Sequence, residues 1–429
     1  MSKFFLKNNF YSFTKILFYL FPFFMLLESF FINVYVTLIT ILVFFVFYFK
    51  KIKIKFDNID YLLFIYFFLG FIASILNIEI IGNFLAVKSF LDFRFLCLFI
   101  AIKNLIEHKL VNLKFIFILA LSCASFLSLD IIYQHINGSD IFGNHPFDGR
   151  YNGTFEHEAI AGSYIQKNFL IAVSVIFLLK TENQNKFLIF FLVSLILGLG
   201  IMLSLDRMPF IVYLFIIILL IIFLKKFRIL LIFNLLFIFI IFNFLFNNYE
   251  VLQGKYYSLS NEFNFKKFKN TPDVKIDKIE KINEAKNESE KFFISGYYKI
   301  YKTSYYIWLE NPVIGSGTRS FGKMCKNLTI NVADITCSTH PHNIYLESLI
   351  TRGILGMLIF LTIIIIIFFD FRRRLVLKKN NFIINVLFLT ILISELWPLR
   401  SYGSIFQTVN GSIFWFVLAL TNSNKTMIK

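Results

Sequence analysis

Long apolar stretches alternate with short polar loops along most of the chain. A membrane-spanning helix needs about 20 mostly apolar residues, and windows of this kind predict about twelve spans. We therefore expect an all-α polytopic membrane protein with about twelve transmembrane helices and one large loop outside the membrane. The predicted spans lie near residues 12–28, 32–49, 60–78, 85–103, 112–133, 164–180, 187–204, 209–224, 229–247, 353–370, 381–398 and 405–421.

Basic residues in the connecting loops predict the orientation of these spans. Lys and Arg gather in every second loop, for example in 50–55, 225–228 and 372–379, whereas the loops between them hold few. Cytoplasmic loops carry the excess of Lys and Arg, so we expect both termini in the cytoplasm. No small-residue cleavage site follows the first apolar stretch, which favours a retained span over a signal peptide.

Composition supports this topology and excludes other classes of protein. Hydrophobic residues make up 58% of the 429 residues, which argues against a soluble globule. The net charge of +17 follows from the loop pattern. Nucleic-acid binding would need a basic face on a soluble domain, and no such domain is visible in the sequence. Richness in Phe, Ile, Lys and Asn is typical of an AT-rich bacterial genome, which predicts a bacterial inner membrane protein with a periplasmic outer side.

Three parts follow from the predicted topology. Residues 1–247 form an N-terminal transmembrane bundle with an outer loop at 134–163, residues 248–342 form the large periplasmic loop, and residues 343–429 form a C-terminal transmembrane part. Within the large loop, residues 248–292 are rich in Lys, Glu and Asn, which predicts a solvated helix or a mobile segment.

Aromatic residues recur at helical spacing over 295–310, at Tyr297, Tyr301, Tyr305 and Trp308. Asn311-Pro312 ends that predicted helix. Such a stripe is typical of a helix at the membrane interface, where amphipathic rings are favoured. A surface that stacks on sugars is the alternative interpretation.

Two histidines lie where the large loop meets the next span, at His340 and His342. Polar groups near lipid usually mark a site. Thr339 or Asn343 can cap the helix that starts here, and the helix dipole lowers the pKa of a nearby histidine. A neutral histidine can accept a proton from a substrate. Two ordinary loop histidines and adventitious metal binding are the alternatives.

The cysteines divide in the same way as the loops and spans. Cys325 and Cys337 both lie in the large outer loop, where disulfides persist, so we expect a bridge between them, with two free thiols as the alternative. Cys97 and Cys123 lie in predicted spans and are expected to pack there. The cysteine and histidine spacing lacks a second ligand pair for zinc, and we expect neither a metal nor a cofactor.

Several cations occupy outer positions. Arg207 lies in a short turn between two spans, where it either reaches lipid headgroups or holds a phosphate through its bidentate guanidinium. Arg319 follows the turn 315–317, whose glycines resemble, without specificity, a phosphate-cradling nest. Asp92 either pairs with Lys88 one helical turn away or has a functional role.

One spacing resembles a family signature. His342-Asn343 is followed by nine residues to Gly353 and by two more to Gly356, which resembles the signature of the O-antigen ligase and polymerase family. The segments 150–155 and 311–317 and the Arg207 turn also look like family landmarks. The resemblance covers most of the chain.

The resemblance implies an inverting, metal-independent glycosyltransferase acting at the periplasmic face. Such a ligase moves a glycan from undecaprenyl diphosphate to the lipid A core, whereas a polymerase joins repeat units. The implied partners are the undecaprenyl-diphosphate-linked glycan donor, a lipid A core or glycan acceptor, and the lipid bilayer. A transporter is the alternative from another class, but transporters often show two similar halves with mid-membrane sites, and here polar residues cluster at outer ends.

The family pattern also implies roles for individual residues. His342 matches the position of the base that activates the acceptor, with His340 as a helper or alternative base. Arg207 is the expected clamp for the diphosphate, and Asn343 orients the site or caps the helix. Further cations for substrate binding, among which the pattern does not single out one, are Arg150, Arg319 and Arg94.

Overall fold

The computed structural model describes residues 2–156, 158, 160–178, 183–249, 252–254, 296–328, 336–377 and 382–423. Within these ranges the regular structure is helical, apart from one isolated β-bridge between Phe147 and Arg150. The all-α prediction is therefore confirmed. Most of 248–292, predicted as a solvated helix or mobile segment, lies outside the described residues.

The helices follow one another with mostly short connections. They are α1 (Ser2–Tyr19), α2 (Phe21–Phe24), α3 (Ser29–Lys50), α4 (Asn58–Leu76), α5 (Ile78–Ile81), α6 (Asn83–Leu91), α7 (Phe93–Glu107), α8 (Leu113–Asn137), α9 (Ala161–Leu178), α10 (Asn183–Leu203), α11 (Arg207–Phe223), α12 (Arg228–Asn248), α15 (Gly296–Glu310), α16 (Phe321–Asn327), α17 (Ile344–Leu377), α18 (Phe382–Glu395) and α19 (Thr408–Asn422), with 3-10 turns η1 (Gly153–Phe155) and η2 (Lys225–Phe227).

Seven of the described helices are long and apolar enough to cross a membrane: α3, α4, α8, α9, α10, α12 and α17. Two shorter apolar helices, α11 and α18, accompany them. The chain is therefore a polytopic membrane protein, as predicted. The count of about twelve spans stays a prediction.

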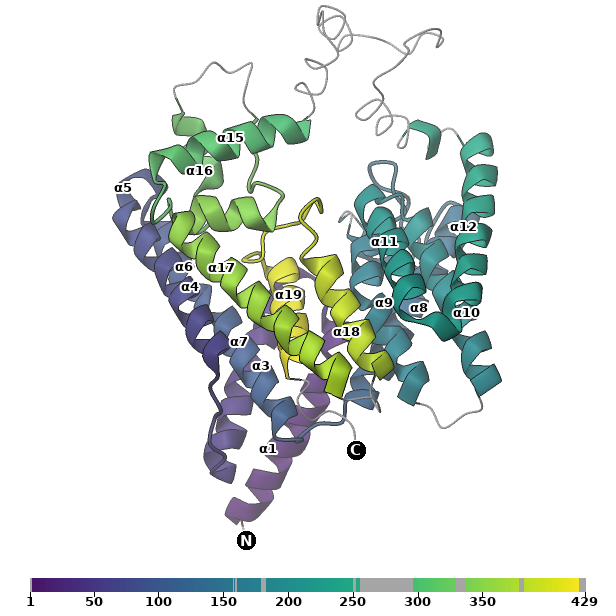
Figure 1. Cartoon of the computed structure of the whole chain (residues 1–429), viewed down its shortest axis with the longest axis horizontal. Helices are drawn as coiled ribbons and strands as arrows, with labels where there is room; N and C mark the ends of the chain where they lie inside the picture. The colour runs from purple at the N-terminus through teal and green to yellow at the C-terminus, as the bar shows by residue number, and fades with distance from the viewer. Residues whose placement is uncertain are drawn as a thin grey trace, which may run out of the picture.

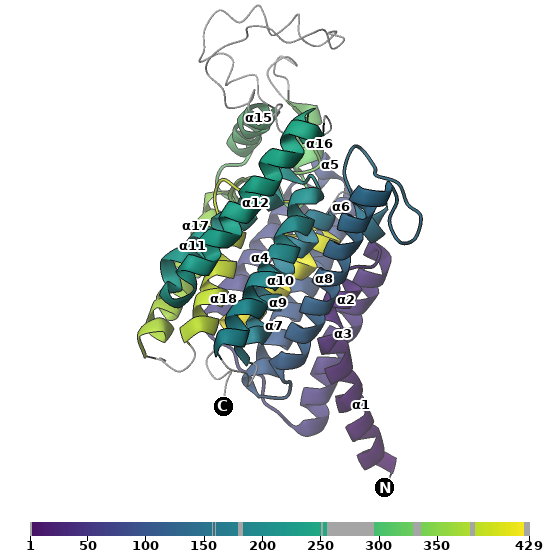
Figure 2. The same ribbon diagram turned by 90° about the vertical axis from the view of Figure 1, so that its right-hand side faces the viewer.

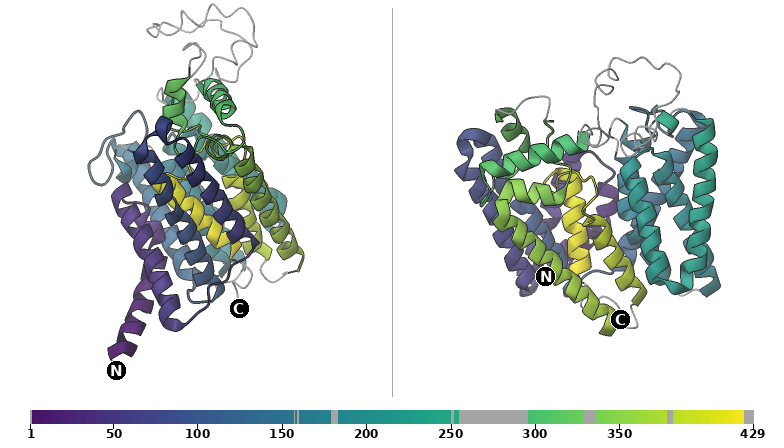
Figure 3. Two further views of the ribbon diagram at one scale, coloured as in Figure 1. Left: turned by 90° about the vertical axis from the view of Figure 1, so that its left-hand side faces the viewer. Right: turned by 45° about the horizontal axis from the view of Figure 1, so that its top comes forward.

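The helices form a bundle with two distinct ends. The start of α1 and the end of α19 lie at one end, whereas α15 and α16 lie across the opposite end, above the start of α17 (Figure 1). Figure 2 shows α8 to α12 packed side by side on one flank. The C-terminal helix α19 runs through the interior behind α4 (Figure 3), packs against α3 and α7, and is buried from Gly411 to Asn422.

Two predicted spans differ from the observed helices. The predicted span 85–103 is broken at Asp92, where α6 gives way to α7. The predicted span 12–28 is divided between α1 and the short α2, which has a proline in its first turn. Proline removes a backbone donor and so begins a helix more readily than it continues one.

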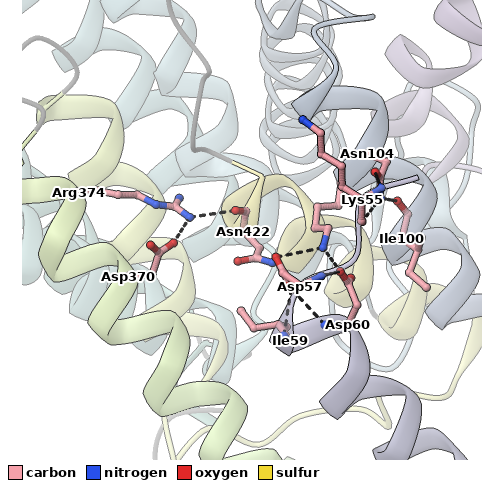
Figure 4. Close-up of polar contacts among 10 residues, drawn as sticks. Lys55, Asp57, Ile59, Asp60, Ile100, Asn104, Asp370, Arg374 and Asn422 are labelled. Carbon is pink, nitrogen blue, oxygen red and sulfur yellow. Dashed lines mark hydrogen bonds and ion pairs between the residues drawn. The ribbon is translucent and has the colours of Figure 1, made fainter. Parts of the chain in front are cut away.

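A buried ionic cluster joins helices at the end of the bundle where the chain starts. Asp57 caps α4 by accepting hydrogen bonds from the backbone of Ile59 and Asp60, at 3.0 and 3.2 Å. Lys103 of α7, itself 1% exposed, pairs with Asp57 at 3.2 Å and with Asp60 (Figure 4). Breaking a buried pair leaves an uncompensated charge, so this cluster fixes α4 against α7.

At the same end, Arg374 of α17 joins this helix to α19. Arg374 pairs with Asp370 one turn earlier (Figure 4). Its guanidinium also donates to the carbonyl oxygens of Thr421 and Asn422, both at 2.9 Å. These bonds satisfy carbonyls at the end of α19, which a helix leaves without internal partners.

Helix α17 is interrupted at Gly353, which has a φ of 63° and a ψ of −166°. The residues between the His342-Asn343 pair and this glycine form the first part of α17. The segment 312–317 supplies the missing backbone partners. Ile354 donates to the carbonyl of Pro312 at 2.9 Å, and Ser316 donates to that of Ile350 at 2.8 Å.

Close backbone approach explains the glycines at this break. A Cβ atom at Gly353 would lie 2.2 Å from the carbonyl oxygen of Val313, and one at Gly315 would lie 2.4 Å from the amide nitrogen of Arg352. Both glycines also have positive φ, at 63° and 85°. The two motifs 311–317 and 342–356 are thus in direct backbone contact.

Gly353→Ala should destabilise the protein. The left-handed backbone costs about 1–3 kcal/mol for a residue with a Cβ, and the new methyl group must displace the 312–317 segment. The expected result is a lower midpoint of thermal unfolding in detergent. Gly254→Ala, where a Cβ meets nothing within 4 Å, is the matched control. Equal midpoints for the two variants would contradict the close packing described above.

Candidate active site

Asn343 begins the site by capping α17. Its side-chain oxygen accepts hydrogen bonds from the backbone of Tyr345 at 2.9 Å and of Leu346 at 3.2 Å. Its side-chain nitrogen donates to the carbonyl of Pro398 at 2.7 Å. Of the two caps that the sequence allowed, Asn343 is thus the one that forms, and it also holds the loop after α18.

The two histidines lie against each other just before this cap, with ring centroids 4.1 Å apart. His342 has a φ of 55°, and its carbonyl accepts a hydrogen bond from the backbone of Tyr402 at 2.9 Å. The His342 Nε2 atom lies 3.1 Å from the hydroxyl of Ser338, and His340 Nδ1 lies 2.8 Å from that of Thr339. Backbone and side-chain contacts therefore fix both rings.

Burial keeps this pair neutral. It lowers the pKa of His340 from 6.5 to about 4, with a further contribution from the neighbouring His342. Burial also lowers the pKa of His342. The expected direction is thus observed, with burial rather than the helix dipole as the leading cause. Among the described residues, the buried Nε2 atom of His340 has no hydrogen-bond partner.

His340 opens onto a cavity of about 530 Å³, which we call the histidine cavity. Three basic residues and one carboxylate are among its lining groups, so the cavity suits an anion. Its charged and polar lining residues include Arg319, Lys323, Lys326, His340, Glu347, Ser404 and Gln407.

Arg319 joins the wall of the histidine cavity to the α6–α7 junction. Its Nη2 atom lies 2.5 Å from a carboxylate oxygen of Asp92 and 2.6 Å from the carbonyl of Phe406. The predicted Lys88–Asp92 pair is therefore wrong, and the Lys88 ammonium lies 4.2 Å from the Phe84 ring centroid instead. Arg319 keeps 24% of its side chain exposed, enough to face the cavity while it neutralises Asp92.

The glycine turn before Arg319 is not a phosphate nest. The backbone N–H groups of Ser316 and Gly317 donate to carbonyls in α17, at 2.8 and 3.1 Å, and that of Thr318 donates to the hydroxyl of Ser74 at 3.0 Å. Since these donors already have partners, the nest interpretation is wrong. The turn connects α17 to the end of α4.

The structure joins Cys325 and Cys337 in a disulfide, with their Cα atoms 5.6 Å apart. Cys337 lines the histidine cavity. The bridge connects α16, which carries Lys323 and Lys326, to the segment that carries His340. It thereby holds the basic wall of the cavity next to the histidines.

Two charged residues near the histidine cavity were not singled out from the sequence. Glu347, in the first turn of α17, lines the cavity and is 4% exposed. Its carboxylate accepts hydrogen bonds from the Ser404 hydroxyl and, at 3.2 Å, from the backbone of Ile405. A carboxylate in an otherwise apolar helix was the available sequence signal.

Arg352 is the second such residue and is 1% exposed. Its guanidinium lies between the rings of Tyr66 and Phe406, 4.2 Å from each centroid. It donates to the carbonyl of Tyr66 at 2.9 Å and to the hydroxyl of Thr351 at 2.7 Å. Arg352 therefore fixes α17 against α4 beneath the cavity, rather than facing it.

The remaining predicted cations occupy two places. Arg150 pairs with Asp206 at 3.0 Å, next to Arg207 at the start of α11. Neither arginine lines the histidine cavity, and α18 packs between α11 and α17 (Figure 1). Arg94 begins α7 beside Asp92, and its guanidinium carbon lies 4.7 Å from the Phe95 ring centroid. The structure thus brings Arg319 to the histidines, and places Arg150 and Arg207 together elsewhere.

A buried polar network braces the loop after α18. Arg400 donates to Glu395 and to Gln166 of α9, both at 2.8 Å. The Tyr402 hydroxyl donates to the other oxygen of Glu395 at 2.5 Å. Because the backbone of Tyr402 holds the His342 carbonyl, the network fixes the position of that histidine.

Part of the chain resembles a known protein family. Residues 192–361 match the family model described as O-antigen ligase. No curated protein matches the chain. The matched range contains Arg207, Arg319, both site histidines and the broken part of α17. The resemblance that the sequence indicated is therefore confirmed.

Proposed function

We propose that the chain, whose residues 192–361 match the O-antigen ligase family model, moves a glycan from undecaprenyl diphosphate to the lipid A core at the periplasmic face. The observation that carries this proposal is the histidine cavity at one end of the membrane bundle, which is lined by three basic side chains and by His340, whose ring packs against that of His342. A base and fixed cations are what transfer from a diphosphate carrier requires.

In the proposed reaction, the acceptor hydroxyl oxygen forms a bond to the anomeric carbon as the bond from that carbon to the diphosphate oxygen breaks. The hydroxyl proton passes to a histidine, which we assign as His342, with His340 as helper. The diphosphate leaves with the bonding electron pair. Arg319 is positioned to stabilise the growing negative charge, and Arg207 and Arg150 are proposed to hold the carrier on the α11 side.

A transfer assay with defined acceptors tests the function. Purified protein in lipid nanodiscs receives an undecaprenyl-diphosphate glycan together with lipid A core. We expect the glycan on the core, with inverted anomeric configuration. A product of joined repeat units would indicate a polymerase instead. If the amount of donor does not fall, so that neither lipid A core nor a second repeat unit receives glycan, the result would contradict the proposal.

The pH dependence of transfer should follow the lowered histidine pKa values. A base works only when unprotonated, so the rate falls as the pH drops through its pKa. An ordinary histidine would place this fall near pH 6.5, whereas burial moves it lower, toward about 4 for His340. We therefore expect the initial rate to fall to half of its maximum at a pH below 6.5. A half-maximal rate at or above that pH would contradict the buried, neutral pair.

A further inference from the structure

A second cavity, of about 370 Å³, adjoins the histidine cavity, and we call it the α9 cavity. Gln407 lines both. This volume falls within the range of small-ligand sites, about 300–1,000 Å³. None of the residues proposed to act as the base or to bind the diphosphate lines the α9 cavity.

The α9 cavity lies at the same end of the bundle as the histidine cavity. Its lining comes from the turn between α2 and α3, the loop before α9, the first turns of α9 and the start of α19. These helix ends are on the side where α15 and α16 lie (Figure 1). A ligand that bridges the two cavities would pass Gln407, directly before α19.

Neutral hydrogen-bonding groups dominate the polar part of the lining, and they come from α3, α9 and the start of α19. Hydroxyls and amides both donate and accept, as the hydroxyls of a sugar require. Two aromatic rings, Phe155 and Tyr164, offer apolar surface beside them. The neutral polar residues are Ser29, Ser163, Gln407, Thr408 and Asn410.

The charges of this cavity do not suit an anion. Among the described lining residues the one cation is Lys167, which donates to the Asn410 side chain at 2.7 Å and lies 4.8 Å from the Tyr402 ring centroid. The Lys167 charge also interacts with Glu395, which compensates it. Glu158, an exposed carboxylate in the lining, would repel a phosphate. The polar groups equally disfavour a lipid chain.

We propose that the α9 cavity binds a neutral sugar residue of the transferred or receiving glycan. The choice of ligand class rests on the proposed function, whereas the site rests on the lining residues. In this arrangement the two cavities bind different parts of the substrates. The basic histidine cavity holds the diphosphate, and the neutral α9 cavity holds carbohydrate next to it.

The test measures two kinds of binding separately on the full-length protein in nanodiscs. Saturation-transfer NMR with methyl glycosides of glucose, galactose and N-acetylglucosamine reports the sugar site. Binding of undecaprenyl diphosphate reports the anion site. Ser163→Phe fills the α9 cavity, and Ser122→Phe, on the exposed face of α8, is the matched control.

We expect Ser163→Phe to weaken glycoside binding at least about tenfold, equivalent to about 1.4 kcal/mol, and to leave undecaprenyl diphosphate binding unchanged. Ser122→Phe should change neither. If Ser163→Phe loses both ligands, the smaller Ser163→Val replaces it and must show the same selective loss. Glycoside binding that Ser163→Phe leaves intact, or that the native protein lacks, would overturn the proposal.

The two proposals fail in different ways. Glycoside binding without undecaprenyl diphosphate binding would contradict the proposed function and leave the sugar site standing. In the transfer assay, a raised KM for the acceptor alone in Ser163→Phe would assign the sugar to the acceptor, and a raised KM for the donor alone would assign it to the donor. Transfer with both KM values unchanged would also overturn the sugar site.

Discussion

Replacing His342 with alanine should lower glycan transfer by about 10²–10⁴-fold, the contribution typical of a general base. The ring is half-buried and neutral, and the residue is held through its own carbonyl by the backbone of Tyr402. Its removal takes away the proton acceptor and leaves the backbone contacts of the loop in place. Transfer from undecaprenyl-diphosphate glycan is the measurement, with the midpoint of thermal unfolding as a check on folding.

His145→Ala is the matched control, because His145 is an exposed histidine in another loop at the same end of the bundle. It should transfer at the native rate. His340→Ala decides between the two candidate bases. Near-native transfer by His342→Ala together with loss in His340→Ala would move the role of base to His340, whose Nε2 atom lies buried without a partner beside the cavity.

Arg319→Gln should produce the second large loss, in both activity and stability. Losing a fixed donor to a developing negative charge costs about 10²–10³-fold in rate. The loss of the Arg319 charge also leaves Asp92, whose side chain is 2% exposed, without this ion-pair partner. Breaking a buried ion pair in this way costs about 3–5 kcal/mol of stability. Transfer rates and unfolding midpoints in detergent measure the two effects. Arg373→Gln, an exposed arginine of α17, is the control.

A double variant separates the two roles of Arg319. Asp92→Asn removes the charge that Arg319 neutralises, so Arg319→Gln with Asp92→Asn should regain most of the stability. Transfer should stay low, because the cation that faces the cavity is still absent. Recovery of transfer along with stability would show that Arg319 acts only through its contact with Asp92.

Local signals carried the fold predictions that succeeded. The helix predicted over 295–310 is observed as Gly296–Glu310, because its aromatic spacing and the following Asn-Pro both act within a few residues. The helix predicted to start beside the two histidines is likewise observed, with Asn343 as its cap. The predicted span 85–103 failed because Asp92 ends α6 with a partner, Arg319, that lies 227 positions away.

The site shows the same difference between residues marked by local signals, which were predicted, and residues whose role depends on distant partners, which were not. The histidines stood out because polar residues are costly next to apolar spans. Glu347 did not, since its role depends on Ser404 and Ile405, which are 57 and 58 positions further along the chain. Grouping the arginines required the packing of α11, α17 and α18, which no periodicity encodes.

The interruption of α17 has a consequence for the order in which the chain assembles during synthesis. The carbonyls of Ile350 and Thr351 accept hydrogen bonds from the segment 312–317, and the N–H groups of Ile354 and Leu355 donate to it. Lipid offers no hydrogen bonds to such groups. The first part of α17 must therefore stay at the water boundary until the segment made before it docks. The histidine site at the start of α17 is therefore completed when the segment 312–317 docks, and not when α17 enters the membrane. This order makes the site one of the last features of the protein to form.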